Sequence, residues 1–155
     1  MIPGTPQALA EDRPVVERTW PPAPRSVGGA RRFLADHLCA WGLSHLTDTA
    51  GLVVSELVTN AVAHAHPPYG HLVFTRFERL ECGVRIEVHD SSDSKPELRE
   101  APDDEESGRG LLLVDVLTGG HWGIGDRNGP GKAVWAICAD DGTDPAVDAA
   151  AGVLR

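Results

Sequence analysis

The chain has 155 residues, of which 41% are hydrophobic and 24% are charged, so it is long enough for one globular domain with a buried core. Its formal net charge of −9 argues against broad electrostatic attraction to nucleic acid or to an anionic membrane. A phosphate ligand is not excluded, because backbone N–H groups, a helix amino terminus or a metal ion can hold phosphate without basic side chains.

The sequence also lacks the signals of secretion and of membrane insertion. No apolar run is long enough to cross a bilayer, and the opening stretch MIPGTPQALAEDRP has neither the basic start nor the apolar centre of a signal peptide. The three cysteines, Cys39, Cys82 and Cys138, are widely spaced and odd in number, which favours reduced thiols over a disulfide framework or a zinc site. We therefore expect a cytoplasmic protein.

The first half of the chain predicts one strand followed by two helices. A short strand in VERTWPP, residues 16–22, is ended by its two prolines. Apolar residues recur at helical spacing over residues 27–41, and Gly42 follows as a stop. A second helix is predicted to begin at residues 47–48, where Thr and Asp are both good amino-terminal caps, and to end near His64.

The second half predicts two pairs of strands on either side of a polar loop and a helix. The first pair alternates between apolar and polar side chains, and the second pair is joined by the turn-forming sequence RNGPG. The helix, GRGLLLVDVLTGG, is predicted to begin near Gly110. In chain order the predicted elements are strands at 71–78 and 83–90, a loop at 91–107, the helix within 108–120, and strands at 121–126 and 132–138.

This order of elements predicts an α+β fold. Strands and helices do not alternate one to one, which argues against a doubly wound parallel sheet and favours a two-layer sandwich with helices on one face of a mixed, mostly antiparallel sheet. The domain is predicted to cover residues 15–138. Residues 1–14 and 139–155 are predicted to be disordered tails, because they carry no hydrophobic period.

A polar stripe runs along the apolar second helix. Glu56, Asn60 and His64 are spaced four residues apart, so they share one face of the helix. Taken alone, such a stripe is more typical of a solvated helix face than of a site. An aspartate at the end of a strand, such as Asp90, is likewise commonly a turn residue.

Two glycines, Gly108 and Gly110, stand before the predicted third helix. The pattern lacks the third glycine of the dinucleotide-binding fingerprint, and no Lys-Ser or Lys-Thr follows at the spacing of a Walker sequence, so neither motif is assigned. Glycine nevertheless lets a backbone approach phosphate closely, and a helix that begins at Gly110 would direct its N–H groups and positive end at such a ligand.

Four stretches, taken together and in order, resemble the Bergerat-fold ATPases, the superfamily of DNA gyrase and sensor histidine kinases. Within it they resemble the small bacterial anti-sigma-factor serine kinases of partner-switching pathways. SELVTNAVAHA is similar to the family's asparagine-bearing helix, IEVHDSSDSKP to its first glycine box, GRGLLLVD to its second glycine box, and GPGKAVWAI to its closing strand. The likeness extends from about Val15 to Cys138 and implies the Bergerat ATP-binding fold.

The resemblance implies roles for four polar residues of the first two boxes. Glu56 would be the general base that takes a proton from a protein serine hydroxyl as it attacks the γ-phosphate. Asn60 would give its side-chain oxygen to Mg²⁺, which prefers oxygen ligands. His64 would lie near the phosphates, or else be a solvent-exposed residue at the helix end. Asp90 would select adenine, because a carboxylate only accepts hydrogen bonds and adenine presents an amino group where guanine presents a carbonyl oxygen.

The resemblance also assigns the second glycine box to the phosphates. It implies that Gly108 and Gly110 contact phosphate, that Leu111 packs beneath the nucleotide, and that Arg109 reaches phosphate or a partner protein. The loop at 91–107 corresponds to the ATP lid of the family.

Two positions depart from the family pattern. Ser92 stands where the family usually has glycine or another very small residue. Ala133 stands where the closing strand often has a threonine that contacts adenine through water. The neighbouring Lys132 is open to two interpretations, a ligand or a solvent-exposed strand residue.

The resemblance implies an ATP- and Mg²⁺-dependent protein serine kinase that regulates transcription. Such a protein binds a sigma factor and phosphorylates a small antagonist protein, and its relatives commonly form homodimers. The alternative is an ATP-binding module that holds a partner but transfers no phosphate. Glu56 favours the enzyme, because a binding module needs no base there, whereas Ser92 and Ala133 favour the alternative.

Overall fold

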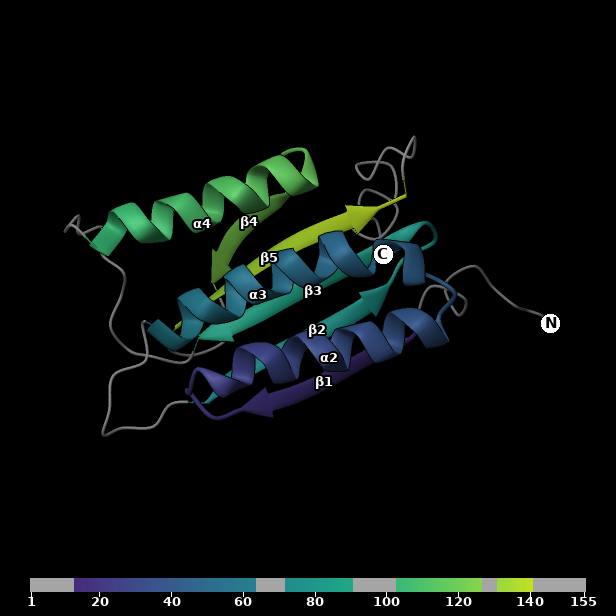
Figure 1. The fold of residues 1–155 in the computed structure, drawn as a ribbon, viewed down its shortest axis with the longest axis horizontal. Helices are drawn as coiled ribbons and strands as arrows, with labels where there is room; N and C mark the ends of the chain where they lie inside the picture. The colour runs from purple at the N-terminus through teal and green to yellow at the C-terminus, as the bar shows by residue number, and fades with distance from the viewer. Residues whose placement is uncertain (1–12, 64–71, 91–102, 127–130, 141–155) are drawn as a thin grey trace.

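The computed structural model describes residues 13–63, 72–90, 103–126 and 131–140, which form a five-stranded sheet with three α-helices (Figure 1). Most of both predicted tails and most of the predicted lid lie outside these residues, as do His64 and Ser92. The elements are β1 (Val15–Trp20), α2 (Arg25–Ala40), the 3₁₀ turn η1 (Ser44–Leu46), α3 (Thr47–Ala63), β2 (Val73–Arg79), β3 (Gly83–Asp90), α4 (Asp103–Thr118), β4 (Trp122–Asp126) and β5 (Lys132–Ala139).

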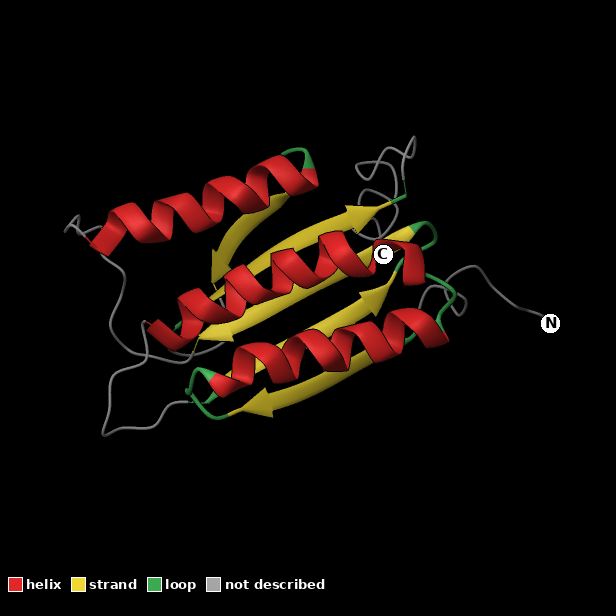
Figure 2. Cartoon of the chain, viewed as in Figure 1, coloured by secondary structure: helices red, strands yellow, loops and turns green. Residues whose placement is uncertain are grey.

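The sheet has the strand order β1-β2-β3-β5-β4, and each neighbouring pair is antiparallel. The chain crosses from β3 through α4 to the edge strand β4, and β5 then returns to pair with both β3 and β4. All three helices cover the same face of the sheet (Figure 2). The predicted α+β sandwich is therefore confirmed, with every described strand pair antiparallel.

The helix α2 is amphipathic and ends where the sequence predicts. Ala30, Leu34 and Leu38 are buried at helical spacing. Gly42 takes a φ of +77°, which an L side chain rarely adopts, and its N–H donates to the carbonyl of Cys39. The Leu43 N–H reaches back to the Leu38 carbonyl, so the helix ends in a Schellman motif that satisfies its last carbonyl groups.

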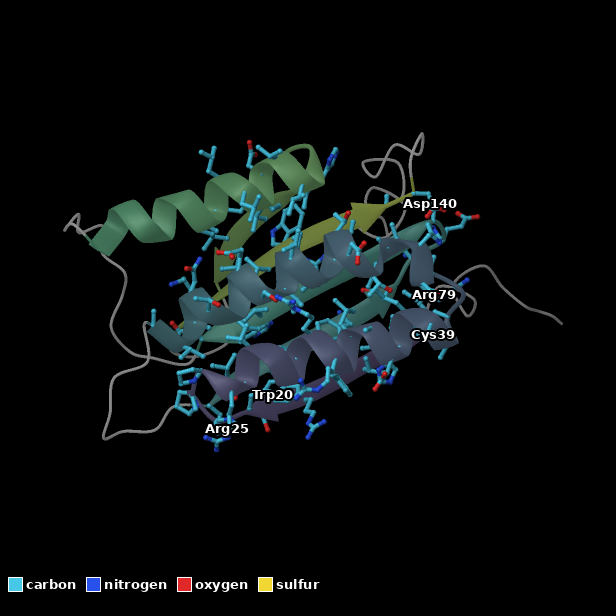
Figure 3. All side chains as sticks on the ribbon, in the orientation of Figure 1. Trp20, Arg25, Cys39, Arg79 and Asp140 are labelled. Carbon is cyan, nitrogen blue, oxygen red and sulfur yellow. The ribbon has the colours of Figure 1, made fainter. Side chains whose placement is uncertain are left out.

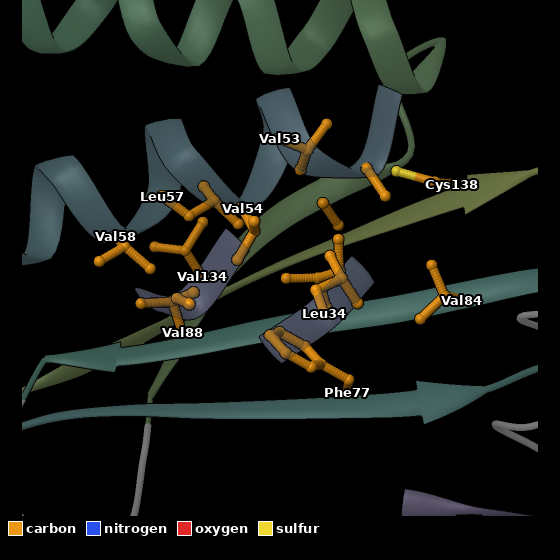
Figure 4. Close-up of a cluster of buried hydrophobic side chains, with 14 of the residues drawn as sticks. Leu34, Val53, Val54, Leu57, Val58, Phe77, Val84, Val88, Val134 and Cys138 are labelled. Carbon is orange, nitrogen blue, oxygen red and sulfur yellow. The ribbon is translucent and has the colours of Figure 1, made fainter. Parts of the chain in front are cut away.

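The helix α3 lies in the middle of the helical layer and contacts α2, α4 and β3. Its apolar side chains pack down onto the strands, where Val58 lies beside Val88 and Val134 (Figure 4). Six of its residues with apolar side chains are buried in the core, and Leu46 of η1 is buried just before it: the six are Ala50, Val53, Val54, Leu57, Val58 and Ala61. Because the apolar side chains occupy the sheet side, Glu56 and Asn60 are left on another side of the helix.

The start of α4 differs from the prediction. The helix begins at Asp103 rather than near Gly110. The acidic residues 103–106, which the sequence predicts to be part of the loop, are therefore helical, and Gly110 lies inside the helix. The residue types are compatible with this start, because the first turn consists of acidic residues and negative charge favours the positive end of the helix dipole. The predicted carboxyl end is correct: Gly119 and Gly120 follow Thr118 with positive φ angles. None of the described helices is both long and apolar enough to cross a membrane.

Candidate functional site

The rotation of α3 about its axis is fixed by a polar link to α2. The Arg31 guanidinium donates from Nε to Ser55 Oγ at 2.9 Å, and the Ser55 hydroxyl donates to the Gly51 carbonyl at 2.7 Å. The Arg31 side chain passes over Gly51, where a β-carbon would be in ordinary van der Waals contact with it at 3.4 Å. Ser55 is buried on the α2 side of α3. The next residue, Glu56, therefore emerges on the side facing α4.

Glu56 and Asn60 converge on one point of α4. A β-carbon built on Gly110 would lie 2.7 Å from Glu56 Oε1 and 3.9 Å from Asn60 Nδ2. Gly110 is itself buried, while Glu56 and Asn60 are half-buried. Glu56 and Asn60 therefore do not lie on a freely solvated helix face. They pack against Gly110 of α4, and the lack of a β-carbon there allows so close an approach.

A second polar pair lies at the ends of two neighbouring strands. Asp90 is the last residue of β3 and Lys132 is the first residue of β5, and the two are direct partners across the antiparallel ladder. The Lys132 Nζ is 4.0 Å from Asp90 Oδ2, with only 18% of the lysine side chain and 8% of the aspartate side chain exposed. Burial lowers the pKa of Lys132, and the negative charge of Asp90 partly opposes that shift.

The elements that carry the two polar clusters begin or end at the same end of the domain. Figure 1 shows the carboxyl end of α3, the carboxyl end of β3 and the amino end of α4 gathered there. β5 runs from Lys132 toward Asp140, which lies at the far end of the molecule from Trp20 and Arg25 (Figure 3). Asp90 is at that end and Asn60 lies in the last turn of α3 near it, whereas Glu56 and Gly110 meet in the middle of α3 and α4.

The predicted effect of Ala133 on the adenine contact stays a prediction, but strand register places Ala133 on a different sheet face from Asp90. Side chains alternate between the faces of a strand, and Ala133 pairs with His89 rather than with Asp90. It therefore points to the sheet face away from the helices, and Lys132 is the residue that stands beside Asp90 on the helix side. Of the two interpretations of Lys132, the solvent-exposed one is wrong, because only 18% of its side chain is exposed.

The remaining predicted residues are placed as follows. Leu111 is half-buried on α4 and packs against the hydrophobic core. Gly108 and Arg109 belong to α4, and the Arg109 side chain is not among the described parts of the structure. The predicted roles of Gly108, Arg109, Gly110 and Leu111 toward a nucleotide stay predictions.

The donor set suits Mg²⁺ held jointly with phosphate rather than a metal held by the protein alone. Within the ranges described, no group of three or more His, Cys, Asp or Glu side chains is placed to hold a metal ion. Mg²⁺ needs few protein ligands when phosphate and water complete its octahedron, and Asn60 offers one oxygen. The lack of a β-carbon at residue 110 lets the α4 backbone approach Glu56 and Asn60 closely.

The sequence matches one protein-family model, the histidine kinase-like ATPase domain, over residues 20–137. The matched region begins in β1 and ends in β5, so it includes every element that contributes to the two polar clusters. A search of curated proteins gives no match.

Proposed function

This chain belongs to the histidine kinase-like ATPase domain family, and from that premise we propose that it is an ATP- and Mg²⁺-dependent protein serine/threonine kinase and anti-sigma factor. It regulates transcription by partner switching, and it phosphorylates a small antagonist protein. The single observation that supports this most is the meeting of Glu56 and Asn60 with Gly110, because it joins a base, an oxygen ligand and a close backbone approach in one place.

Each group has a distinct task in the proposed reaction. Glu56 accepts the proton of the substrate hydroxyl, which needs a carboxylate within hydrogen-bond reach of the nucleophile. Asn60 supplies an oxygen to Mg²⁺, and the metal neutralises charge on the phosphates when it is bound. Asp90 accepts from the 6-amino group of adenine and thereby orients the nucleotide. Phosphoryl transfer depends mainly on such positioning, so this short set of side chains is sufficient.

The proposed partners follow from the family likeness of the four boxes. They are a sigma factor and its small antagonist protein, with no direct contact to nucleic acid or membrane. The net charge of −9 supports the absence of nucleic-acid binding. A homodimer in the cytoplasm is the proposed working state.

A second function is supported by the same contact. In this structure Gly110 packs against the Glu56 carboxylate, which α4 therefore partly covers. A carboxylate held in that position suits a module that binds ATP and a partner protein without transferring phosphate. The two functions differ in one measurable step, the transfer of the γ-phosphate.

The experiment that separates them uses γ-labelled ATP, Mg²⁺ and candidate antagonist proteins from the same genome. The kinase is expected to label one candidate on serine or threonine, while an Asp90→Asn variant binds ATP at least about 10-fold more weakly and gives little label. Tight ATP binding with no labelled candidate would favour the binding module. Absence of ATP binding would contradict both functions.

A further inference from the structure

Lys132 occupies a position that a strand lysine seldom takes. It faces the helix-covered side of the sheet, directly across the ladder from Asp90, and its ammonium lies 4.0 Å from the aspartate carboxylate. Keeping a lysine there is unfavourable on solvation grounds, since burial lowers its pKa. A lysine with no role beyond contact with solvent would be expected on the sheet face that the helices do not cover, where the neighbouring residue Ala133 points.

Asp90 and Lys132 together make an ordered pair of hydrogen-bonding groups. A carboxylate only accepts hydrogen bonds, and an ammonium only donates them, with three N–H groups at its disposal. Lys132 can therefore remain beside Asp90 and still donate to a ligand. The end of β3 thus presents an acceptor, Asp90, and the adjoining start of β5 presents a donor, Lys132, 4.0 Å away.

The Watson–Crick edge of adenine has the complementary order. Its 6-amino group is a donor, and the adjacent ring atom N1 is an acceptor, whereas guanine presents an acceptor at position 6 and a donor at N1. We propose that Lys132 is the second base-recognition residue of the site, donating to N1 of adenine while Asp90 accepts from the 6-amino group. This inference rests on the proposed binding of ATP and extends it to a residue that the sequence alone leaves open.

Lys132 also provides the opposite charge that the buried Asp90 carboxylate requires. A buried carboxylate is costly unless it is paired, and Lys132 places an opposite charge beside Asp90. Lys132 therefore contributes in two ways, through its own hydrogen bond to the base and as the counter-ion of Asp90. A lysine that acted only as a counter-ion would make no hydrogen bond to the base. Removing N1 of adenine would then leave its contribution unchanged, whereas a hydrogen bond from Lys132 to N1 would be lost.

The test compares ADP with 1-deaza-ADP, in which N1 is replaced by C–H, by isothermal titration calorimetry on the full chain. The control ligand is 7-deaza-ADP, which is changed on the other side of the ring. Wild-type protein is expected to bind 1-deaza-ADP about 10-fold or more weakly than ADP, since a hydrogen bond from a charged group is lost, and to bind 7-deaza-ADP almost as well as ADP.

Two variants complete the experiment, with thermal unfolding to show that each is folded. Lys132→Met is expected to bind ADP about 10-fold more weakly and to lose the preference for ADP over 1-deaza-ADP, while Lys132→Gln, which keeps a donor, retains part of that preference. If Lys132→Met still prefers ADP as strongly as wild type does, or if wild type binds 1-deaza-ADP as well as ADP, the inference is overturned while the proposed function stands. If wild type binds no adenine nucleotide, the proposed function fails and the inference fails with it.

Discussion

Gly110 of α4 lies so close to Glu56 of α3 that a β-carbon built on residue 110 falls 2.7 Å from Glu56 Oε1. The only part of Glu56 within 3 Å is the end of a flexible side chain, so a Gly110→Ala chain can fold by moving the carboxylate. Alanine is favoured over glycine inside a helix by about 1 kcal/mol, so stability is expected to be kept or slightly raised. The displaced carboxylate and the added methyl are expected to weaken ATP binding about 10-fold or more.

Urea unfolding and calorimetric ATP titration of Gly110→Ala test both parts of this prediction. Gly28→Ala is the matched control, because Gly28 lies inside α2, far from Glu56, and its β-carbon would approach only the end of Arg32 at 3.5 Å. Unchanged ATP affinity in Gly110→Ala would show that the approach of α4 to Glu56 has no part in nucleotide binding.

The helix α4 is expected to open when nucleotide binds. Gly110 is inside the helix here, and an interior N–H group is already used by the helix. Backbone N–H groups at Gly108 and Gly110 can reach phosphate only if the turns before them unwind. Hydrogen exchange measured by mass spectrometry should therefore change in the first half of α4 when ADP and Mg²⁺ are added, and stay constant in α2. Identical exchange of α4 with and without nucleotide would contradict binding through these glycines.

Two adjacent glycines of α2 are expected to respond in opposite directions to alanine. A β-carbon on Gly29 would lie 2.7 Å from the Trp20 ring, which is buried and donates from Nε1 to Thr75 Oγ1 at 3.0 Å. The ring cannot move away without breaking that bond, so Gly29→Ala should lower the free energy of unfolding by about 1–3 kcal/mol. Gly28→Ala should raise it by up to about 1 kcal/mol. Urea unfolding followed by circular dichroism measures both, and equal stability of the two variants would show that the Trp20 contact is not rigid.

The free thiols are expected to differ widely in reactivity. Cys39 is exposed, whereas burial raises the pKa of Cys138 from 9.0 to about 12. The thiolate is the reactive form, so at pH 8 only roughly one part in ten thousand of Cys138 is reactive, and access is blocked as well. A disulfide reagent at pH 8 should label Cys39 rapidly and Cys138 only after unfolding. Rapid labelling of Cys138 in the native protein, identified by peptide mass, would contradict the buried position of β5.

Much of the fold follows from local pattern. The alternation of Val84, Ile86 and Val88 predicts the buried face of β3, and Gly42 predicts the end of α2. The start of α4 is not predictable in this way, because acidic residues are typical both of solvated loops and of the first turn of a helix. Local composition cannot decide between these two states, and packing of the later turns of α4 against α3 and β5 decides it.

Only some residues of the candidate site can be predicted from the sequence. Glu56, Asn60 and Asp90 can be singled out because a known family has the same residue types in the same order. Lys132 cannot be assigned to the site in this way, because Asp90 lies 42 residues earlier in the chain. Only the register between β3 and β5 brings the two residues together. Strand register also decides that Lys132, and not Ala133, faces the site. Nor does the sequence indicate that Arg31 and Ser55 hold α3 in the rotation that points Glu56 at α4.

The proposal as a whole depends on Glu56 acting as a base, and the Glu56→Gln variant tests that most directly. The substitution keeps the size of the side chain and removes its ability to accept a proton. We predict that ATP affinity stays within about 2-fold of wild type, while single-turnover transfer of labelled phosphate to the antagonist protein falls at least about 100-fold. A Glu56→Gln protein that binds ATP and transfers phosphate at the wild-type rate would contradict the account.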